Sequence, residues 1–334
     1  MTKNNNQADI YVSTCGDVWA NQGFEQLLYR DPHLCRPLLY LWQNNNCVVI
    51  GRRQNAWKEC DWKKLEADGG KLARRISGGG AVYHDPGNLN FTLIMPRRQY
   101  DQEQINTLLL TALRSLQITA IQNGRNDLTA AGKKFSGHAF AFSTAAALHH
   151  GTILVDCDFA RLGDFLSPDQ QKIRAKGISS VRSRVINLRQ LQPTLTIEQV
   201  KQALIQQFIQ VFGMAHPQTI DTATQVPSPT YAHFASWAWR FGEAPPFEID
   251  LEQRFSWGNL QLCLAPKNGF IAAARAYSDA LDEEFISLIE QTLPGLEYRY
   301  TPIAQALTAL GQRCTTSRQQ QITAVVEWLT KELL

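Results

Sequence analysis

Three consecutive glycines (residues 78–80) stand in the middle of the stretch ARRISGGGAVYHDPGN, residues 73–88. Because glycine has no side chain to pack, some other group must approach the backbone closely at this point. The strand-like residues on either side predict a tight loop between two strands. This loop is either an ordinary glycine-rich hairpin or a cradle whose N–H groups, beside Arg74 and Arg75, bind a phosphate or another oxyanion.

The chain is long enough for two domains and has no generally basic surface. It contains 334 residues, of which 44% are hydrophobic and 19% charged, so it can bury a substantial core. The formal net charge is only +3, from 33 Lys and Arg against 30 Asp and Glu. This balance argues against nucleic acid as a partner and makes any anion site local.

The sequence also constrains where the protein works. No apolar run reaches the length of a membrane span, and the first nine residues are polar without an apolar signal core after them. The seven cysteines are scattered and form no C-x-x-C pair, which argues against a metal cluster or a disulfide framework. We therefore expect no membrane association and a location in the reducing cytoplasm.

Helical and strand patterns follow one another irregularly through the first two thirds of the chain. Asp17 is expected to cap a helix that ends near Arg30, and Thr196 a helix that ends near Phe212. The strands come in antiparallel-looking runs rather than in strict β-α-β alternation, which predicts an α+β fold of mixed, largely antiparallel sheets flanked by helices. The expected strands are 38–43, 47–51, 89–95, 118–121, 133–142 and 147–156, and further helices are expected at 61–67, 102–116 and 159–165.

The remainder of the chain predicts a second, smaller domain. Residues 214–232 are rich in Pro, Thr and Ser and are expected to form a surface excursion, and residues 242–246 a linker. We expect a large domain at residues 1–245 and a small α+β domain at 246–334. The small domain is expected to hold a hairpin of strands 254–264 and 270–277 and helices near 282–291, 302–310 and 317–333.

Two lysines stand at the start of the predicted strand 133–142, shortly after Asp127. Asp127 itself begins a strand and could either ligate a metal or cap a turn. Because side chains alternate along a strand, Lys134 and Ser136 are expected on one face and the preceding lysine on the other. One lysine can therefore be surface charge while the other points at a ligand.

The adjacent residues His149 and His150 lie in another predicted strand. They must point to opposite faces and cannot together chelate a metal, so one of them is expected in the core.

Glycine N–H groups, an arginine and a lysine within one sheet would stabilise the charge that gathers on the α-phosphate when ATP activates a carboxylate. The chain has neither a Walker A motif nor a G-x-G-x-x-G fingerprint, which argues against P-loop kinases and dinucleotide enzymes.

Six ordered segments carry the pattern of a known family. They are VVIGRRQNAWKEC (48–60), LARRISGGGAVYHDPGN (72–88), GRNDL (124–128), KFSG (134–137), HHGTIL (149–154) and AKGISSVRSRVINL (175–188). Together they resemble the lipoate–protein ligase A family of the bacterial type. The similarity continues through SWAWRFGEAPPF (236–247) and RFSWGNLQL (254–262), which implies the small C-terminal accessory domain of that family.

The resemblance implies a biotin/lipoate ligase-like catalytic domain and a two-step reaction. Lipoate and MgATP would give lipoyl-AMP and pyrophosphate, and the lipoyl group would then pass to one lysine of an apo-lipoyl domain through an amide bond. Acceptors in the family are the acyltransferase subunits of 2-oxoacid dehydrogenase complexes and the glycine-cleavage H protein. No exposed apolar stripe is evident in the sequence, so a monomer is expected.

The resemblance also implies roles for individual residues. Lys134 is expected to be the catalytic residue, bridging the lipoyl carboxyl and α-phosphate oxygens of ATP or lipoyl-AMP. Asp127 is similar in position to an acid near the phosphates and Mg2+. The other expected nucleotide contacts are Arg75, Gly80, Ala81, Val82 and Tyr83.

Two further segments complete the implied site. His150 and Gly151 are expected to line the lipoyl pocket or its phosphate end. The polar, basic loop at residues 175–184 is expected to close over the adenylate and exclude water.

Three other interpretations remain open at this point. An octanoyl or lipoyl transferase of the same fold would use a cysteine thioester, for which Cys157 is the candidate, although no lysine or arginine lies within two residues of it. A biotin–protein ligase shares the adenylate chemistry, but SGGGAVYHD stands where its glycine- and arginine-rich signature would be. The third is a lipoyl-domain-binding or adenylate-binding protein that has lost its catalytic step, although the presence of Arg75 and Lys134 argues against it. The preference between lipoate and octanoate also stays open.

Overall fold

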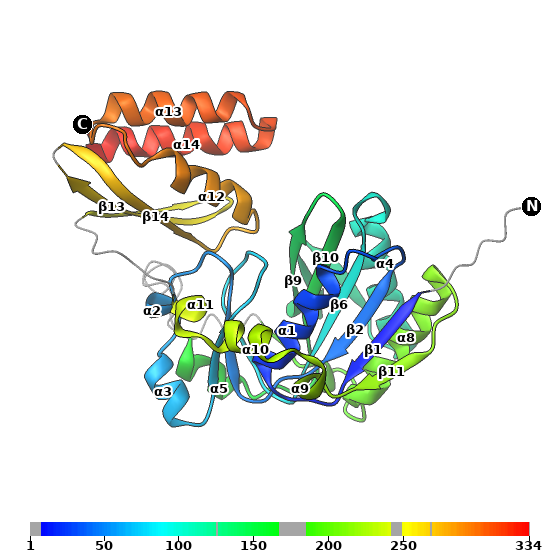
Figure 1. The fold of residues 1–334 in the computed structure, drawn as a ribbon. Helices are drawn as coiled ribbons and strands as arrows, with labels where there is room; N and C mark the ends of the chain where they lie inside the picture. Colours follow the sequence, from blue (N-terminus) through cyan, green and yellow to red (C-terminus); the bar gives the residue numbers. More distant parts are fainter. Residues whose placement is uncertain (1–7, 125, 167–184, 242–248, 268, 334) are drawn as a thin grey trace, which may run out of the picture. The chain divides into compact units, whose positions relative to one another are not determined.

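The computed structural model describes residues 8–124, 126–166, 185–241, 249–267 and 269–333 (Figure 1). The chain forms two compact units. The large unit comprises Met1–Val49, Trp57–Ile76 and Val82–Arg240, and the small unit comprises Ile50–Ala56, Ser77–Ala81 and Phe241–Leu334. The expected linker and the boundary between residues 245 and 246 lie outside the described residues, so both stay predictions.

An eight-stranded sheet is the centre of the large unit, with the order β11-β1-β2-β6-β10-β9-β8-β7. The β11–β1 and β1–β2 pairs are parallel, and every pair from β2–β6 onward is antiparallel. The predicted α+β class with mixed, largely antiparallel sheets is therefore confirmed. The strands are β1 (Asp9–Ser13), β2 (Leu38–Trp42), β6 (Asn88–Pro96), β7 (Ala120–Asn123), β8 (Asp127–Ala130), β9 (Lys133–Phe142), β10 (Ala146–Leu154) and β11 (Pro217–Ile220).

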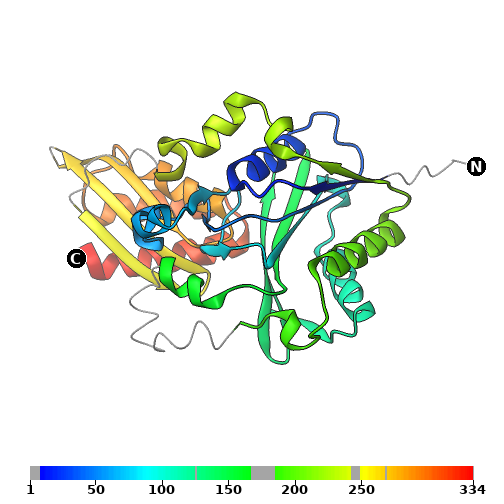
Figure 2. The same cartoon turned by 90° about the horizontal axis from the view of Figure 1, so that it is seen from below.

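Helices cover both faces of this sheet. Helices α4 (Gln102–Ser115) and α8 (Ile197–Phe212) lie side by side on one face, as Figures 1 and 2 show, and enclose the main apolar core. Helix α1 (Val18–Tyr29) lies against β6 and β10 on the other face. Asp17 caps α1, and Thr196 forms a capping box at the start of α8, so both predicted helix starts are confirmed.

A second, three-stranded sheet in this part of the chain has the order β4-β3-β5. Its strands are β3 (Cys47–Ile50), β4 (Lys71–Arg74) and β5 (Val82–His84), accompanied by the short helices α2 (Ala56–Glu59), α3 (Trp62–Ala67) and α5 (Phe159–Phe165). Strands β4 and β5 flank β3 and do not pair with each other. The glycine-rich segment therefore joins two strands across a third one, and the interpretation as an ordinary hairpin is wrong.

The N-terminal strand β1 and the segment after α8 differ from expectation. Residues 214–232, expected as a surface excursion, contain a strand that was not predicted, because Pro217–Ile220 pairs in parallel with β1 as the edge strand β11. The sequence PQTI lacks the apolar alternation of a half-buried strand, since this edge is largely exposed. Helices α9 (Thr222–Gln225), α10 (Ser228–Ala235) and α11 (Trp237–Phe241) follow, and 3-10 turns occur at Arg97–Gln99 and Leu188–Gln190.

The small unit contains an antiparallel sheet, β12-β13-β14, and three helices around one apolar core. Its elements are β12 (Ile249–Phe255), β13 (Gly258–Lys267), β14 (Phe270–Ser278), α12 (Glu283–Thr292), α13 (Tyr300–Gln312) and α14 (Thr316–Leu333). The single strand expected at 254–264 is wrong, because the chain turns between Phe255 and Gly258, whose φ of 156° favours glycine. None of the helices in the described part of the chain is long and apolar enough to span a membrane.

Candidate active site

The residues predicted to bind substrates belong to both units. Arg75, Val82, Tyr83, Asp127, Lys134, His150 and Gly151 belong to the large unit, and Gly80 and Ala81 to the small one. Residues 175–184, expected to close over an adenylate, lie outside the described residues.

Lys134 reaches the α1 side of the large sheet because strand β9 bulges next to it. Adjacent residues of β8 pair with Ser136 and Lys134, which leaves Phe135 as an extra residue on β9. The Lys134 side chain consequently lies over Gly137, where a Cβ would come within 2.9 Å of Nζ. The bulge reverses the regular alternation at this point.

Ser136 points to the opposite face. Its Oγ lies 3.1 Å from Nε2 of His138, and the His138 ring packs edge-on against Phe91 of the main core, with 5.3 Å between ring centroids. The expectation that Lys134 and Ser136 share a face is therefore wrong, because simple alternation does not hold across a bulge.

Asp127 lies beside Lys134 at the start of β8. It pairs in register with Gly137, and its Oδ1 is 2.8 Å from Lys134 Nζ. The Asp127 and Lys134 side chains are 32% and 39% exposed, but the Oδ1 atom that contacts the ammonium is itself buried. The Lys134 backbone is also held, because its carbonyl accepts a hydrogen bond of 2.9 Å from the Ile186 N–H. The described residues contain no group of three or more His, Cys, Asp or Glu side chains placed to hold a metal.

His150 is oriented by a buried carboxylate from α1. Its Nδ1 lies 2.8 Å from Oε1 of Glu25, which also accepts a hydrogen bond of 2.6 Å from the Thr92 hydroxyl. Thr92 accepts in turn from the Trp42 indole N–H at 3.0 Å. Because a carboxylate only accepts, His150 must carry its proton on Nδ1. As predicted, His149 points to the other face, where its Nε2 contacts His138 at 3.0 Å.

His84 is buried with one ring nitrogen unpaired. Its Nδ1 accepts from the Asn44 amide at 3.0 Å, so the neutral ring carries its proton on Nε2, which has no hydrogen-bond partner among the described residues. Burial, the Arg75 charge and His150 lower the pKa of His84 to about 3. A buried N–H donor without an acceptor costs free energy unless a ligand supplies one.

Two asparagines on β6 also have buried polar atoms without hydrogen-bond partners among the described residues. Asn88 Nδ2 donates to Asn90 Oδ1 at 3.0 Å, which leaves Asn88 Oδ1 and Asn90 Nδ2 without partners among the described residues although both side chains are buried. The hydroxyl of Tyr83 on β5 is likewise buried and unpaired within the described chain. Burial raises the pKa of Tyr83, so this hydroxyl stays protonated.

The register of β6 and β10 joins several of these groups into one polar stripe. Thr92 is opposite His150, and Asn90 is opposite Thr152, whose hydroxyl accepts a hydrogen bond of 3.3 Å from Gly137 N–H. Lys134 lies over that same glycine. The stripe therefore runs along the α1 face from the Glu25–His150 pair to the Lys134 ammonium.

Most residues of this stripe were not predicted from the sequence. A signal was present in NLNFT (88–92), where a strand buried on both faces carries polar residues at every second position. Such residues in a buried strand need partners, and a ligand can be one of them. Glu25 gave no comparable signal, because one acid on an amphipathic helix is normally on the surface. The residues missed are Glu25, Trp42, His84, Asn88, Asn90 and Thr92.

Gly151, expected to line the lipoyl pocket or its phosphate end, has its side-chain position directed away from the α1 face. A Cβ there would come within 2.7 Å of Phe91 and 2.8 Å of His138, both on the α4 and α8 side. Only the backbone of Gly151 can line the α1 face.

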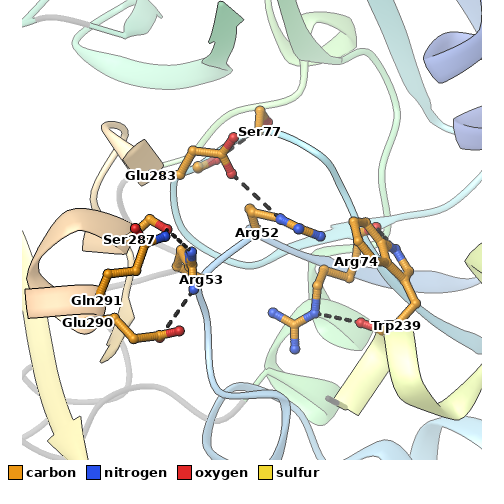
Figure 3. Close-up of polar contacts among 10 residues, drawn as sticks. Arg52, Arg53, Arg74, Ser77, Trp239, Glu283, Ser287, Glu290 and Gln291 are labelled. Atoms are coloured by element: carbon orange, nitrogen blue, oxygen red, sulfur yellow. Dashed lines mark hydrogen bonds and ion pairs between the residues drawn. The ribbon is translucent and has the colours of Figure 1, made fainter. Parts of the chain in front are cut away.

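The two arginines before the glycine loop have different environments. Arg74 is buried and donates to the carbonyls of Trp239 and Arg240 at the end of α11. Figure 3 shows the contact with Trp239. The Trp239 indole returns a hydrogen bond of 2.8 Å to the Arg74 carbonyl. Arg75 is also buried, donates to the Val49 carbonyl at 3.2 Å, and lies close enough to lower the pKa of His84. Arg74 thus holds the end of α11, whereas Arg75 lies near the buried His84 ring.

The three glycines have distinct surroundings in the small unit. At Gly78 a Cβ would come within 2.5 Å of the Ala280 carbonyl oxygen and 2.7 Å of that of Leu281. Gly79 has a φ of 92° and donates its N–H to Ala280 at 3.0 Å. At Gly80 a Cβ would meet no atom within 4 Å. The close approach expected from the sequence is thus made at Gly78 by backbone carbonyls of the small unit.

An arginine network supports the same unit (Figure 3). Arg53 donates to Glu290 at 3.2 Å and to the Ser287 hydroxyl at 2.5 Å, and its carbonyl accepts from Ser278 N–H at 2.6 Å. The Arg53 and Glu290 side chains are only 19% and 16% exposed. This network holds the loop 50–56 against α12 and β14.

Cys157, the candidate nucleophile of the transferase interpretation, is buried. Burial and the neighbouring carboxylates Asp85 and Asp156 raise the pKa of its thiol well above the ordinary value. A thiol in this environment is protonated at neutral pH and is a poor nucleophile.

Comparison with known proteins places this architecture in a family. Residues 17–209 match the lipoyl protein ligase A/B catalytic domain, and residues 244–329 match the bacterial lipoate protein ligase C-terminus. The first match alone spans more than half of the chain.

Solved structures agree with this match. The chain is similar to LipL1 of P. falciparum in complex with lipoate, with 29% identity over 97% of this chain and 99% of that one and a TM-score of 0.85. It is also similar to a structure from the lipoylation system of Thermoplasma acidophilum, described as a bi-partite lipoate protein ligase and its E2 lipoyl domain (28% identity, 73% of this chain and 99% of that chain covered, TM-score 0.63). A lipoate-protein ligase A bound with ATP shares 26% identity over 71% of this chain and 99% of that chain, with a TM-score of 0.62. The chain belongs to the lipoyl protein ligase A/B family and carries the C-terminal domain of bacterial lipoate protein ligases.

Proposed function

We propose that the protein is an ATP-dependent lipoate–protein ligase that forms lipoyl-AMP and then lipoylates one lysine of a lipoyl domain. The family match and the relatives whose structures hold lipoate or ATP support these substrates. The acceptors would be apo-lipoyl domains of 2-oxoacid dehydrogenase complexes and the H protein. The relative described together with its E2 lipoyl domain supports lipoyl domains as acceptors. We further propose that the enzyme is a cytoplasmic monomer.

The observation that carries this proposal is the position of Lys134 at one end of the polar stripe. Its ammonium can neutralise oxygens of the lipoyl carboxylate and the α-phosphate as negative charge gathers there. A carboxylate oxygen bonds to the α-phosphorus while the bond from that phosphorus to pyrophosphate breaks. The acceptor amine then attacks the acyl carbonyl, AMP leaves, and the amine releases a proton.

The unpaired buried groups suit the binding of such a ligand. The His84 Nε2–H and the Asn90 amide can donate to its oxygens, and Asn88 Oδ1 can accept from a hydroxyl or an amine. His150 and the backbone of Gly151 would line the lipoyl arm. The nucleotide contacts would be Arg75, Gly80, Ala81, Val82 and Tyr83.

Asp127 is the residue that would hold Mg2+. It is a single, partly exposed carboxylate beside the proposed catalytic lysine. Mg2+ is commonly held by one or two carboxylates together with substrate phosphates, so this donor set fits. When bound, the metal would supply charge neutralisation at the phosphates.

The environment of Cys157 favours the ligase over a cysteine-dependent transferase. A thioester mechanism needs a thiolate, and burial beside Asp85 disfavours that form. A ligase needs no cysteine, because ATP supplies the activated acyl group.

A mass-spectrometric assay tests the proposal. An apo-lipoyl domain is incubated with the protein, ATP, Mg2+ and either lipoate or octanoate, and its mass is measured. The proposal predicts an ATP-dependent mass increase that survives Cys157→Ser, and the two acids reveal the chain-length preference. Transfer from an acyl-carrier thioester without ATP, abolished by Cys157→Ser, would instead establish the transferase.

A further inference from the structure

A chain of buried hydrogen bonds runs behind Lys134, on the side of the sheet that faces the main core. Ser136 Oγ lies 3.1 Å from His138 Nε2, His138 Nδ1 lies 3.0 Å from His149 Nε2, and His149 Nδ1 lies 3.4 Å from the Tyr100 hydroxyl. Three strand residues and one loop residue are thus linked in a line across β9 and β10.

This chain lies in apolar surroundings. Ser136 and His149 are 0% exposed and His138 is 4% exposed, while Phe91 and Phe140 pack against the rings. Polar groups in such a place are tolerated only when their partners are in position, so a satisfied network specifies one local geometry. The Glu25–His150 pair lies on the other face of the sheet and is not part of this network.

At neutral pH both histidine rings of this hydrogen-bond network are neutral. Burial is the main reason that the pKa of His138 falls to about 3, with Lys134 and His150 lowering it further, and burial holds the pKa of His149 well below its ordinary value. A neutral ring has one donor and one acceptor nitrogen, so the three hydrogen bonds must all be donated in the same direction along the line from Tyr100 to Ser136.

The network meets the bulge of β9 at Ser136. Phe135 is the extra residue, with Lys134 before it and Ser136 after it. The Lys134 side of the bulge is held by the hydrogen bond from Ile186, and the Ser136 side by His138. Without the bulge, regular alternation would turn Lys134 away from the face that carries Gly137.

We propose that His138, held by His149, is a positioning residue that fixes the bulge of β9 and so directs the Lys134 ammonium to the α1 face. His138 acts through Ser136 and touches no substrate. The effect of His138 on catalysis rests on the proposed function of Lys134. Its effect on the orientation of the lysine does not depend on that function.

Replacing His138 with either of two amides separates its two contacts. The Gln amide reaches about as far as Nε2 and can still bind Ser136, whereas the shorter Asn amide corresponds to Nδ1 and reaches only His149. His138→Asn and Ser136→Ala should therefore cause the same defect, and His138→Gln should be milder. His216→Asn, at an exposed histidine, is the matched control.

Selective acetylation measures the orientation of Lys134 without any enzymatic assay. The folded variants are treated with an amine-acetylating reagent, and the labelling rate of Lys134 relative to its exposed neighbour Lys133 is read by peptide mass spectrometry. His138→Asn and Ser136→Ala both remove the hydrogen bond between residues 136 and 138, which should release Lys134 from Asp127. We expect the labelling ratio to rise about fivefold, the factor that corresponds to the free energy of one ordinary hydrogen bond. The double variant should show no further increase, because both changes break the same link.

Adenylation kinetics give the second readout. In the same two variants kcat for lipoate-dependent ATP–pyrophosphate exchange should fall about tenfold with KM little changed, because the lysine is needed in the transition state. Unchanged labelling in folded Ser136→Ala and His138→Asn would overturn the positioning role. A changed labelling ratio in a protein whose wild type shows no exchange would refute the proposed function and leave the positioning role intact.

Discussion

The Lys134 ammonium lies 2.8 Å from the Asp127 carboxylate, although the two residues come from adjacent strands whose pairing is interrupted by a bulge. This contact places a cation and an acid at one end of a polar stripe on an otherwise well-packed sheet. A cation and a metal-binding acid together can stabilise a phosphate-centred transition state. The same geometry distinguishes the two adjacent lysines, because Lys134 contacts Asp127 whereas Lys133 is exposed.

Removing the charge of Asp127 should weaken the first half-reaction. In Asp127→Asn the lysine loses its partner and the nucleotide loses its acidic metal ligand, so adenylation should slow by about ten- to a hundredfold. The KM for MgATP, measured by pyrophosphate exchange, should rise more than the KM for lipoate. An equal rise in both would show that Asp127 does not act on the phosphates.

Glu25→Gln should disturb the lipoyl end of the stripe. Glu25 is 1% exposed, and its Oε1 accepts hydrogen bonds from both Thr92 and His150. The amide oxygen of Gln is uncharged, so it accepts these two hydrogen bonds more weakly than a carboxylate oxygen does. We expect a loss of about 1–3 kcal/mol in the free energy of unfolding by urea. The KM for lipoate should rise while that for ATP changes little.

The matched control is Glu198→Gln at an exposed helical position, where the side chain is 66% exposed. It should change the free energy of unfolding by no more than about 0.5 kcal/mol. A Glu25 variant as stable as this control, with unchanged KM for lipoate, would contradict the role of Glu25.

The glycine loop offers a comparison between neighbouring positions. Gly78→Ala would push a methyl group to 2.5 Å from a backbone oxygen, so it should destabilise the small unit by about 1–3 kcal/mol. Gly80→Ala meets no atom within 4 Å and should leave the unfolding midpoint unchanged. If nucleotide approaches Gly80, this second variant should nevertheless raise the KM for ATP. An unchanged KM would remove Gly80 from the nucleotide site.

Stability should depend on pH through His84. The folded protein holds this ring neutral, with its pKa lowered from 6.5 to about 3, so the unfolded chain takes up the proton first as the pH falls. The contribution is complete above pH 6.5 and is lost as the pH drops from 6.5 towards 3, by about 1.4 kcal/mol per pH unit. Urea titrations at several pH values should show a shallower decline for His84→Gln than for wild type. The exposed His216→Gln should match wild type, and a His84 variant that also does so would refute the buried neutral ring.

Local sequence signals predicted most of the helices and strands, but not β1 or the short helices α2, α9, α10 and α11. Asp17 and Thr196 cap their helices because a short side chain before an apolar periodic run satisfies the first N–H groups. The β8–β9 hairpin was also predicted, and its turn has positive φ at Ala131 and Gly132. Edge strand β11 was missed, since an exposed edge needs no apolar pattern.

The candidate site was less accessible to sequence reasoning. Lys134 was selected through the family resemblance, and the strand-face argument beside it failed because KKFSG contains no mark of an extra residue. The glycines correctly indicated a close approach, but at Gly78 the approaching groups are the carbonyls of Ala280 and Leu281, some 200 residues later in the chain. Contacts of such long sequence separation leave no local pattern.

The most direct test of the proposed chemistry is lipoate-dependent exchange of labelled pyrophosphate into ATP by wild type and Lys134→Ala. Both proteins should have the same far-ultraviolet circular dichroism spectrum, because Lys134 is partly exposed and outside the core. The proposal predicts exchange that requires lipoate and Mg2+ in wild type and none above background in Lys134→Ala. Normal exchange by a folded Lys134→Ala protein would contradict the assignment of Lys134 as the catalytic residue.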